Sequence, residues 1–219
     1  LPVSAEEMHE RGWWWYDALV VGGDAYVDHP SFGTAVISRV LEAEGLRVAV
    51  LAQPDWHDAE AFRAMGRPRL GVFIGAGNLD SMVAHYTAAK RRRSEDFYSP
   101  GKRSGCRPDR AAIVYCNRAR EAFGPDMPII LGSLEASLRR FAHYDYWDDS
   151  VRRAILFDAP ADLLVYGMGE AATIEIAHRL KKKQSVRTMT DIPGTGYITR
   201  DPSVCKFDHI TLPSFEDVR

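Results

Sequence analysis

Short apolar runs alternate along the chain with segments whose apolar residues recur at helical spacing. The run DALVVG ends in glycine, and the segment SFGTAVISRVLEAEG after it places Phe32, Val36, Ile37, Val40 and Leu41 on one helical face. The same succession recurs down the chain. It predicts five strands, at about 17–22, 47–52, 69–75, 128–132 and 163–167.

Helices are expected between these strands. Ser4 and Glu7 have the spacing of a capping box, which predicts a first short helix over about 5–11. The later helices are expected at about 31–45, 58–66, 80–92, 109–123, from 134 and at 170–183. Because the strands are apolar throughout, they are buried on both faces, as in a parallel sheet. The prediction is a doubly wound α/β fold with strand order 2-1-3-4-5.

Two parts of the chain depart from this alternation. Residues 90–108 are basic, polar and punctuated by glycine and proline, which predicts a long loop inside the domain. After Gln184 the text SVRTMTDIPGTGYITRDPSVC has no helical period. We therefore expect an α/β domain over 1–183 and an irregular, extended arm over 184–219.

Composition narrows the class of partner. With 28 Lys and Arg against 30 Asp and Glu, the net charge of -2 gives no overall attraction to nucleic acid or an anionic membrane. The three cysteines, Cys106, Cys116 and Cys205, fit neither a disulfide framework nor a short-loop zinc site. No apolar stretch is long enough to span a membrane, and the first residues do not look like a signal peptide. We expect a cytoplasmic protein.

The loops after the strands are the places to look for a ligand, because open parallel sheets bind ligands beyond the carboxyl ends of their strands. The candidate ligand-facing residues there are Asp24, Asp28, His29, Ser31, Asp55, Asn78, Ser81, Glu135 and Glu170. Their acidic bias favours a neutral polar or cationic ligand over a bare phosphate. A purely structural interpretation stays open, since Asp28 and Ser31 are also favoured capping and turn residues.

Several motifs of known chemistry are absent. GAGNLD lacks the third glycine of a dinucleotide loop, and neither G-x-x-x-x-G-K-[ST] nor G-x-S-x-G occurs. The one dense basic run is KRRR at 90–93, within a basic 90–110 segment that also holds Phe97 and Tyr98. This segment supports an alternative function, an interaction or RNA-associated binding module. A solvated loop face is the competing interpretation.

Six phrases of the chain resemble the N-terminal region of the YgiQ-type radical SAM protein family, in the family's order. They are GDAYVDHPSFG, AQPDW, GNLDSMVAHYTA, LGSLEASLRRFAHYDYW, ADLLVYGMGE and DIPGTGY. The resemblance implies a flavodoxin-like, cobalamin-binding-like domain that precedes a radical SAM barrel. It also implies that the barrel binds a [4Fe-4S] cluster and S-adenosylmethionine through a C-x-x-x-C-x-x-C run.

No C-x-x-x-C-x-x-C run is present in this chain. The resemblance therefore implies that the catalytic part lies downstream of Arg219, and that this chain alone binds no cluster and is not catalytic. Its expected partner is its own radical SAM domain, whose active site it shapes or covers. The substrate is not indicated by any residue.

The sequence of the first loop also bears on whether this chain binds cobalamin. Corrin-binding domains with a histidine ligand use D-x-H-x-x-G there, whereas here Asp28 and His29 are adjacent and Gly33 is four residues past His29. Val27 stands where the orienting Asp belongs, and Gly132 is followed by Ser133 instead of a second glycine. We expect hydroxocobalamin to bind this chain weakly or not at all, and His29 not to ligate cobalt.

Overall fold

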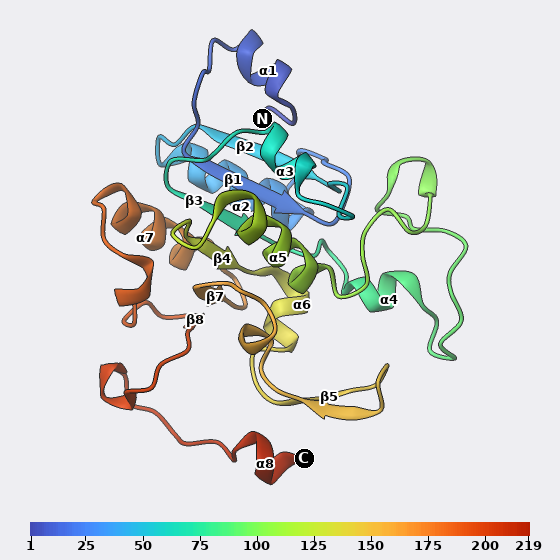
Figure 1. The fold of residues 1–219 in the computed structure, drawn as a ribbon, viewed down its shortest axis with the longest axis vertical. Coiled ribbons are helices and arrows are strands. Elements are labelled where there is room, and N and C mark those ends of the chain that lie inside the picture. Colours follow the sequence, from blue (N-terminus) through green and yellow to red (C-terminus); the bar gives the residue numbers. More distant parts are fainter.

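A six-stranded sheet with the order β2-β1-β3-β4-β7-β8 forms the centre of the computed structural model, which describes residues 1–219 (Figure 1). Its strands are β1 (Ala18–Gly22), β2 (Val48–Ala52), β3 (Gly71–Ile74), β4 (Ile129–Leu131), β7 (Leu163–Val165) and β8 (Thr195–Gly196). The first five of these are parallel to their neighbours. The predicted parallel strands and their order 2-1-3-4-5 are therefore confirmed.

The sixth strand corrects the expectation of an irregular arm. Gly196 pairs with Leu164 and Thr195 with Val165, so β8 runs antiparallel to β7 at the edge of the sheet. An antiparallel edge strand on a parallel sheet is a common arrangement. Two residues are too short a strand to show a period of two, which is why the sequence pattern did not reveal it.

Helices cover both faces of the sheet. On one face α2 (Gly33–Ala43) lies beside α7 (Glu170–Lys181), and on the other α3 (Glu60–Ala64) lies beside α5 (Ala111–Phe123). Alternate strand residues serve the two faces: Val20 packs in the core cluster beneath α2 and α7, whereas Leu19 packs in the cluster that contains Phe62 of α3 and Tyr115 of α5. This alternation is what a sheet buried on both faces requires.

The capping box at the first helix is only partly formed. α1 spans Ala5–Glu10, and the Ser4 hydroxyl accepts the Glu7 N–H at 3.2 Å as predicted. The Glu7 carboxylate, however, accepts the N–H of Val3 at 3.1 Å, one residue before the expected donor. The Ser4 hydroxyl thus caps the helix, and the reciprocal bond from the Glu7 carboxylate goes to Val3 instead of Ser4.

The predicted helix over 80–92 is wrong beyond its first turn. α4 spans only Ser81–His85, because Tyr86 adopts an extended backbone conformation and forms an isolated β-bridge with Arg92. From there to α5 the chain is irregular apart from a 3-10 turn at Pro100–Lys102. Asp80 is the N-cap residue of α4, and its side chain accepts the N–H groups of Met82 and Val83.

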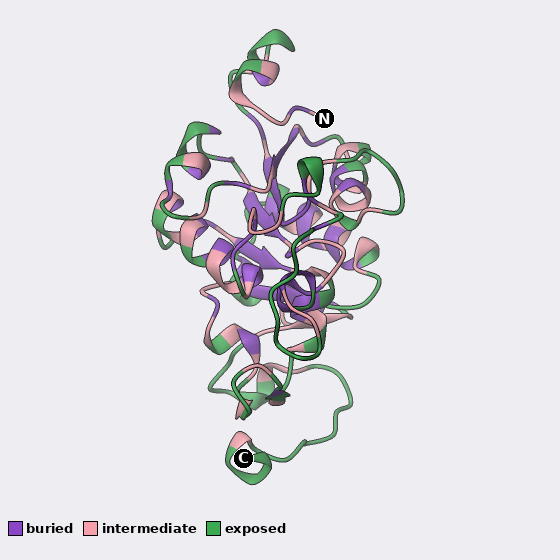
Figure 2. Ribbon diagram, turned by 90° about the vertical axis from the view of Figure 1, so that its right-hand side faces the viewer, coloured by how far each residue is buried: buried purple, intermediate pink, exposed green.

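The remaining elements lie beyond β4. They are α6 (Ser133–Leu138), a hairpin of β5 (His143–Asp145) and β6 (Ser150–Arg152), α8 (Phe215–Val218), and 3-10 turns at Ile155–Phe157, Val186–Thr188 and Pro202–Val204. Buried residues gather in the strands and the helices beside them, and in the arm Val186, Met189 and Ile192 are buried while the residues from Ile198 on are mostly exposed (Figure 2). No helix combines the length and apolar character that a membrane span requires.

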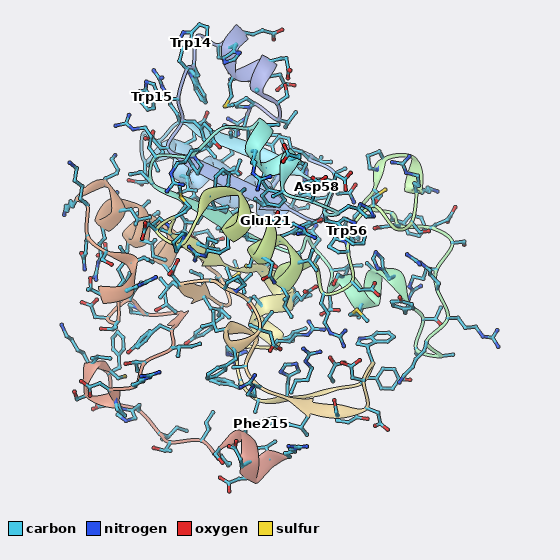
Figure 3. All side chains as sticks on the ribbon, viewed as in Figure 1. Trp14, Trp15, Trp56, Asp58, Glu121 and Phe215 are labelled. Atoms are coloured by element: carbon cyan, nitrogen blue, oxygen red, sulfur yellow. The ribbon has the colours of Figure 1, made fainter.

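Trp14 and Trp15 lie at one end of the molecule and Phe215 of α8 at the other (Figure 3). The three adjacent tryptophans differ in their surroundings. Trp13 packs against the core, Trp15 lies 4.0 Å from the Arg47 guanidinium, and Trp14 is 79% exposed. The cluster thus contributes packing and cation–π contacts at the end away from the arm.

Gly23 permits the close approach of two loops. A Cβ at Gly23 would lie 2.0 Å from the backbone oxygen of Ala76, which cannot move aside without displacing the third loop. We expect Gly23→Ala to lower the free energy of unfolding by more than about 2 kcal/mol, measured by urea titration. Gly33→Ala is the matched control, since an added Cβ there meets no atom within 4 Å. Equal effects of the two variants would contradict this account.

Candidate functional site

The predicted site residues lie at the carboxyl edge of the sheet, either in the loops after the parallel strands or in the first turns of the helices that follow, where Ser81, Glu135 and Glu170 stand. The first loop follows β1, the second follows β2, the third follows β3, and the remaining two lead into α6 and α7. The structure divides the predicted residues into three groups. Some are buried and bonded to protein, some are exposed on turns, and Glu170 lies in the lining of an apolar cleft.

Asp24 belongs to a buried ionic network. Its carboxylate accepts from Arg107 Nη1 at 2.8 Å and from the Asn78 N–H at 2.7 Å. The fully buried Arg107 also donates to Asp96 through Nε at 3.0 Å and Nη2 at 2.8 Å, and to the Ala76 carbonyl at 3.2 Å. Burial raises the pKa of Asp24, and the guanidinium opposes that effect. The lone pairs of Asp24 are thus directed at protein donors.

Gly77 shows how tightly this network is enclosed. Its φ of +110° favours glycine, and a Cβ there would lie 2.2 Å from the Asp24 carboxylate. Asn78, next in the chain, donates to the Ser31 carbonyl at 2.9 Å and accepts the Gly33 N–H at 3.3 Å. Asn78 therefore ties the first loop to the third.

Ser81 and Glu135 join three helix starts. The Glu135 side chain is fully buried and accepts the N–H groups of Ser81 at 2.9 Å and Ala112 at 3.0 Å. The Ser81 hydroxyl accepts the N–H of Ala111 at 3.0 Å. Burial, with the nearby Asp80 carboxylate, raises the pKa of Glu135. Both side chains satisfy backbone donors that a helix start would otherwise leave unpaired.

The predicted site residues that are exposed lie on turns. Asp28 pairs with Arg39 of α2, and His29 Nδ1 accepts the Ser31 N–H at 3.2 Å. Asp55 lies 2.6 Å from His57 Nδ1 on the second loop. These residues are open to solvent, but they do not converge on one point with Asp24 and Glu135. No group of three or more His, Cys, Asp or Glu side chains is placed to hold a metal ion.

An apolar cleft opens between the sheet, α2 and α7. It has a volume of about 310 Å³. Its floor comes from alternate residues of four parallel strands, and its sides from the first turns of the two helices; the lining includes Val20, Val36, Ile37, Phe73, Ile130, Val165 and Thr173. Glu170, Ser133 and Met168 lie at the loop ends of this lining. The cleft therefore lies at the carboxyl edge, where open parallel sheets bind ligands.

Small residues keep the cleft open. A Cβ added at Gly33 would meet no atom within 4 Å, and a Cβ added at Gly132 would meet only the Val165 carbonyl oxygen, at 3.7 Å. Neither has a positive φ, so neither position needs glycine for its backbone. Ser133, by contrast, is held at φ 75°. Strained backbone of this kind is concentrated at functional sites.

The sequence analysis did not identify this cleft, because its lining is mainly apolar. The glycines of the sequence could have indicated the cleft. Six of them lie in the cleft lining and flank the loops after β1, β3, β4 and β7: Gly33, Gly75, Gly77, Gly132, Gly167 and Gly169. One glycine in a loop is unremarkable. Their convergence is visible only once the strands are side by side.

Four cations of the basic 90–110 segment donate to protein acceptors, although only Arg107 among them is buried. Arg107 is buried, Arg110 donates to Asp145 at 2.9 Å and Asp148 at 2.6 Å, and Arg93 Nε donates to backbone carbonyls. Lys90 reaches the Trp147 carbonyl at 3.2 Å. Groups committed to protein acceptors contribute less to phosphate binding, so this geometry does not favour the RNA-associated alternative.

A family model matches the whole chain. The model of the family described as Radical SAM N-terminal matches residues 1–219. The chain belongs to this family. The resemblance drawn from the six phrases is thereby confirmed.

The relatives of this Radical SAM N-terminal chain are longer proteins. It is 56% identical over 218 residues to a UPF0313 protein of Clostridium botulinum strain 657, covering 100% of this chain and 34% of that protein. It is 52% identical over 218 residues to a UPF0313 protein of Clostridium perfringens strain SM101, covering 100% and 33% respectively. The chain thus spans about a third of the length of the curated relatives it matches.

One solved structure shares the fold. The Radical SAM N-terminal chain resembles a radical S-adenosylmethionine methyltransferase, TsrM, from Kitasatospora setae, whose structure has cobalamin and a [4Fe-4S] cluster bound. The TM-score is 0.50 and the identity 21%, over 84% of this chain and 27% of that one. This likeness supports the cobalamin-binding-like fold class.

The Arg107 network generates a stability prediction. Removing the guanidinium would leave Asp24 and Asp96 buried without their cation, so we expect Arg107→Ala to lower the free energy of unfolding by about 3–5 kcal/mol. Arg91→Ala is the matched control, because Arg91 is exposed and lies in the same irregular segment. Chemical denaturation of both variants measures the difference. A loss below about 1 kcal/mol for Arg107→Ala would show that the network is not needed for stability.

Proposed function

We propose that this chain is the N-terminal accessory domain of a radical SAM, [4Fe-4S]-dependent enzyme, and that its cleft forms one wall of a ligand site shared with the catalytic portion. The observation that carries the proposal is the apolar cleft at the carboxyl edge, kept open by Gly33 and Gly132. Family membership supports the class of enzyme, and the length of the relatives supports a separate catalytic portion.

The cleft suits binding and enclosure more than proton transfer. Its lining is largely apolar, and the carboxylates of Asp24 and Glu135 nearby already accept protein hydrogen bonds. In the intact enzyme the cluster would supply the electron that cleaves S-adenosylmethionine. The contribution of this chain is to hold an apolar part of a ligand and to exclude water, which protects reactive intermediates from side reactions.

The three cysteines do not form a cluster site in this chain. Cys106 precedes α5, Cys116 is buried within α5 and Cys205 lies in the arm, and all three are free thiols. Burial raises the pKa of the Cys116 thiol, which disfavours the thiolate that a metal needs. The cluster ligands are therefore expected from the catalytic portion.

The first test compares this chain with the intact protein after anaerobic reconstitution with iron and sulfide. We expect about four irons per intact chain, with cleavage of S-adenosylmethionine to 5′-deoxyadenosine under reducing conditions, and neither property in residues 1–219 alone. Iron analysis and product chromatography are the measurements. A stable cluster on residues 1–219, or an intact protein that fails to cleave S-adenosylmethionine, would contradict the proposal.

A second candidate function is corrinoid binding without histidine ligation. The cleft offers an apolar slot between α2 and α7, and TsrM, which shares the fold, binds cobalamin. His29 does not fit the ligand role, because its Nδ1 accepts the Ser31 N–H. A neutral imidazole in that arrangement carries its proton on Nε2 and has no free lone pair for cobalt. A corrinoid would therefore be held by its nucleotide tail in the cleft.

Hydroxocobalamin tests this second candidate. We expect weak or no retention by residues 1–219 alone, since the tail would be the main point of attachment. In the intact protein, Gly33→Leu is expected to remove any retained cobalamin by filling the cleft, and His29→Ala to leave it unchanged. Visible spectra after gel filtration measure both. A ligand-shifted cobalt band that disappears in His29→Ala would contradict this prediction, and no retention by the unmodified intact protein would remove the candidate.

A further inference from the structure

Large apolar side chains are exposed on α6 and on the segments next to it. They are Leu134 at 44% exposure, Leu138 at 60%, Phe141 at 52%, Tyr166 at 37% and Met168 at 87%. We call these five residues the α6 patch. Single exposed apolar residues are common on protein surfaces, but a gathered set usually marks an interaction site.

Contacts through neighbouring residues link the segments that carry the α6 patch. Leu134 and Leu138 are four residues apart on one helix, so they are neighbours on its surface. The guanidinium carbon of Arg140 lies 4.7 Å from the Phe141 ring centre and 5.0 Å from that of Tyr166. The loop of Tyr166 and Met168 is tied to α6, because the Gly167 N–H donates to the Ser137 hydroxyl at 3.3 Å. The patch is thus one surface formed by two segments.

The α6 patch borders the mouth of the cleft. Met168 belongs to the cleft lining, and Leu134 follows directly after Ser133, which also lines it. A partner that covered the patch would therefore lie against the open end of the cleft. This arrangement couples the interaction surface to the ligand site.

The chemistry of the patch is that of a protein interface. It contains two leucines, a methionine and two aromatic rings that both lie beside Arg140, and none of its five members is charged. Aromatic residues, Met and Arg are enriched in interface centres, where aromatic residues and Arg also supply much of the binding energy. Its partner is expected to be apolar at the centre of the contact.

The same side of the molecule carries the exposed arm. α8 contacts β6 of the hairpin that follows α6, and Ile210 in the arm is 83% exposed. Trp14 lies at the opposite end (Figure 3). The relatives carry about twice as much further sequence, since the chain covers only 34% of the first of them. The arm and the α6 patch are therefore two apolar surfaces on one side, with a large part of the intact protein available to cover them.

We propose that the α6 patch is the docking surface for the catalytic portion of the intact protein, which thereby closes the mouth of the cleft. This inference rests on the proposed function and identifies the residues that make the contact. The occupant is the same polypeptide and not a second copy of this chain.

Amide hydrogen exchange on the intact protein and on residues 1–219 tests the proposal. We expect amides of residues 133–141 and 165–169 to exchange at least about tenfold more slowly in the intact protein. Leu138→Asp and Met168→Asp, on separate segments, are each expected to remove this protection by placing a charge in the contact. Trp14→Asp is the matched control, because it changes an exposed apolar side chain at the other end and should leave the protection intact.

Each outcome separates the docking surface from the enzyme assignment. Equal exchange in the intact protein and in residues 1–219 would overturn the docking surface, even if the intact protein cleaves S-adenosylmethionine. Protection at the patch without a cluster would leave the docking surface standing and overturn the proposed function. Concentration-dependent protection in residues 1–219 alone would identify a second copy as the occupant and overturn the proposal.

Discussion

The buried guanidinium of Arg107 is the contact on which the carboxyl edge depends. Removing a charge from water is costly, and here two carboxylates and one carbonyl offset that cost through Nε, Nη1 and Nη2. The two carboxylates come from different parts of the chain, Asp24 from the first loop and Asp96 from the irregular segment after α4. That segment has little regular structure, and this charge cluster, together with the bonds from the Ala25 N–H to the Tyr98 carbonyl and from Gln53 to Ser99, holds it against the loops.

The network also explains why the polar loop residues are poor candidates for chemistry. Asp24 and Glu135 were expected to face a ligand, yet both are buried and accept hydrogen bonds from protein donors. The strong acceptors at this edge stabilise loop packing and helix starts. Ligand space remains on the other side of the edge, where α2 and α7 leave the apolar cleft.

An apolar cleft without converging acids, bases or metal ligands suits a domain that binds and encloses. The outer surface is also suited to binding, because the α6 patch and the arm both expose apolar side chains on one side of the molecule. The domain thus presents polar loop residues bonded to protein beside an apolar opening. Exposed apolar surface of this kind usually marks an interaction site.

The sequence by itself determined the five parallel strands, their order and the family, because apolar runs and amphipathic segments report burial locally and the six phrases are specific. It also located the loops at the carboxyl edge. Three features were decided only by tertiary structure. α4 ends at His85 because Tyr86 bonds across a turn, β8 forms because two arm residues meet an edge strand, and Arg107 is buried because Asp24 and Asp96 converge on it. The last two depend on partners distant in the chain, about which local patterns carry no information, and the first depends on a turn that a helical pattern does not reveal.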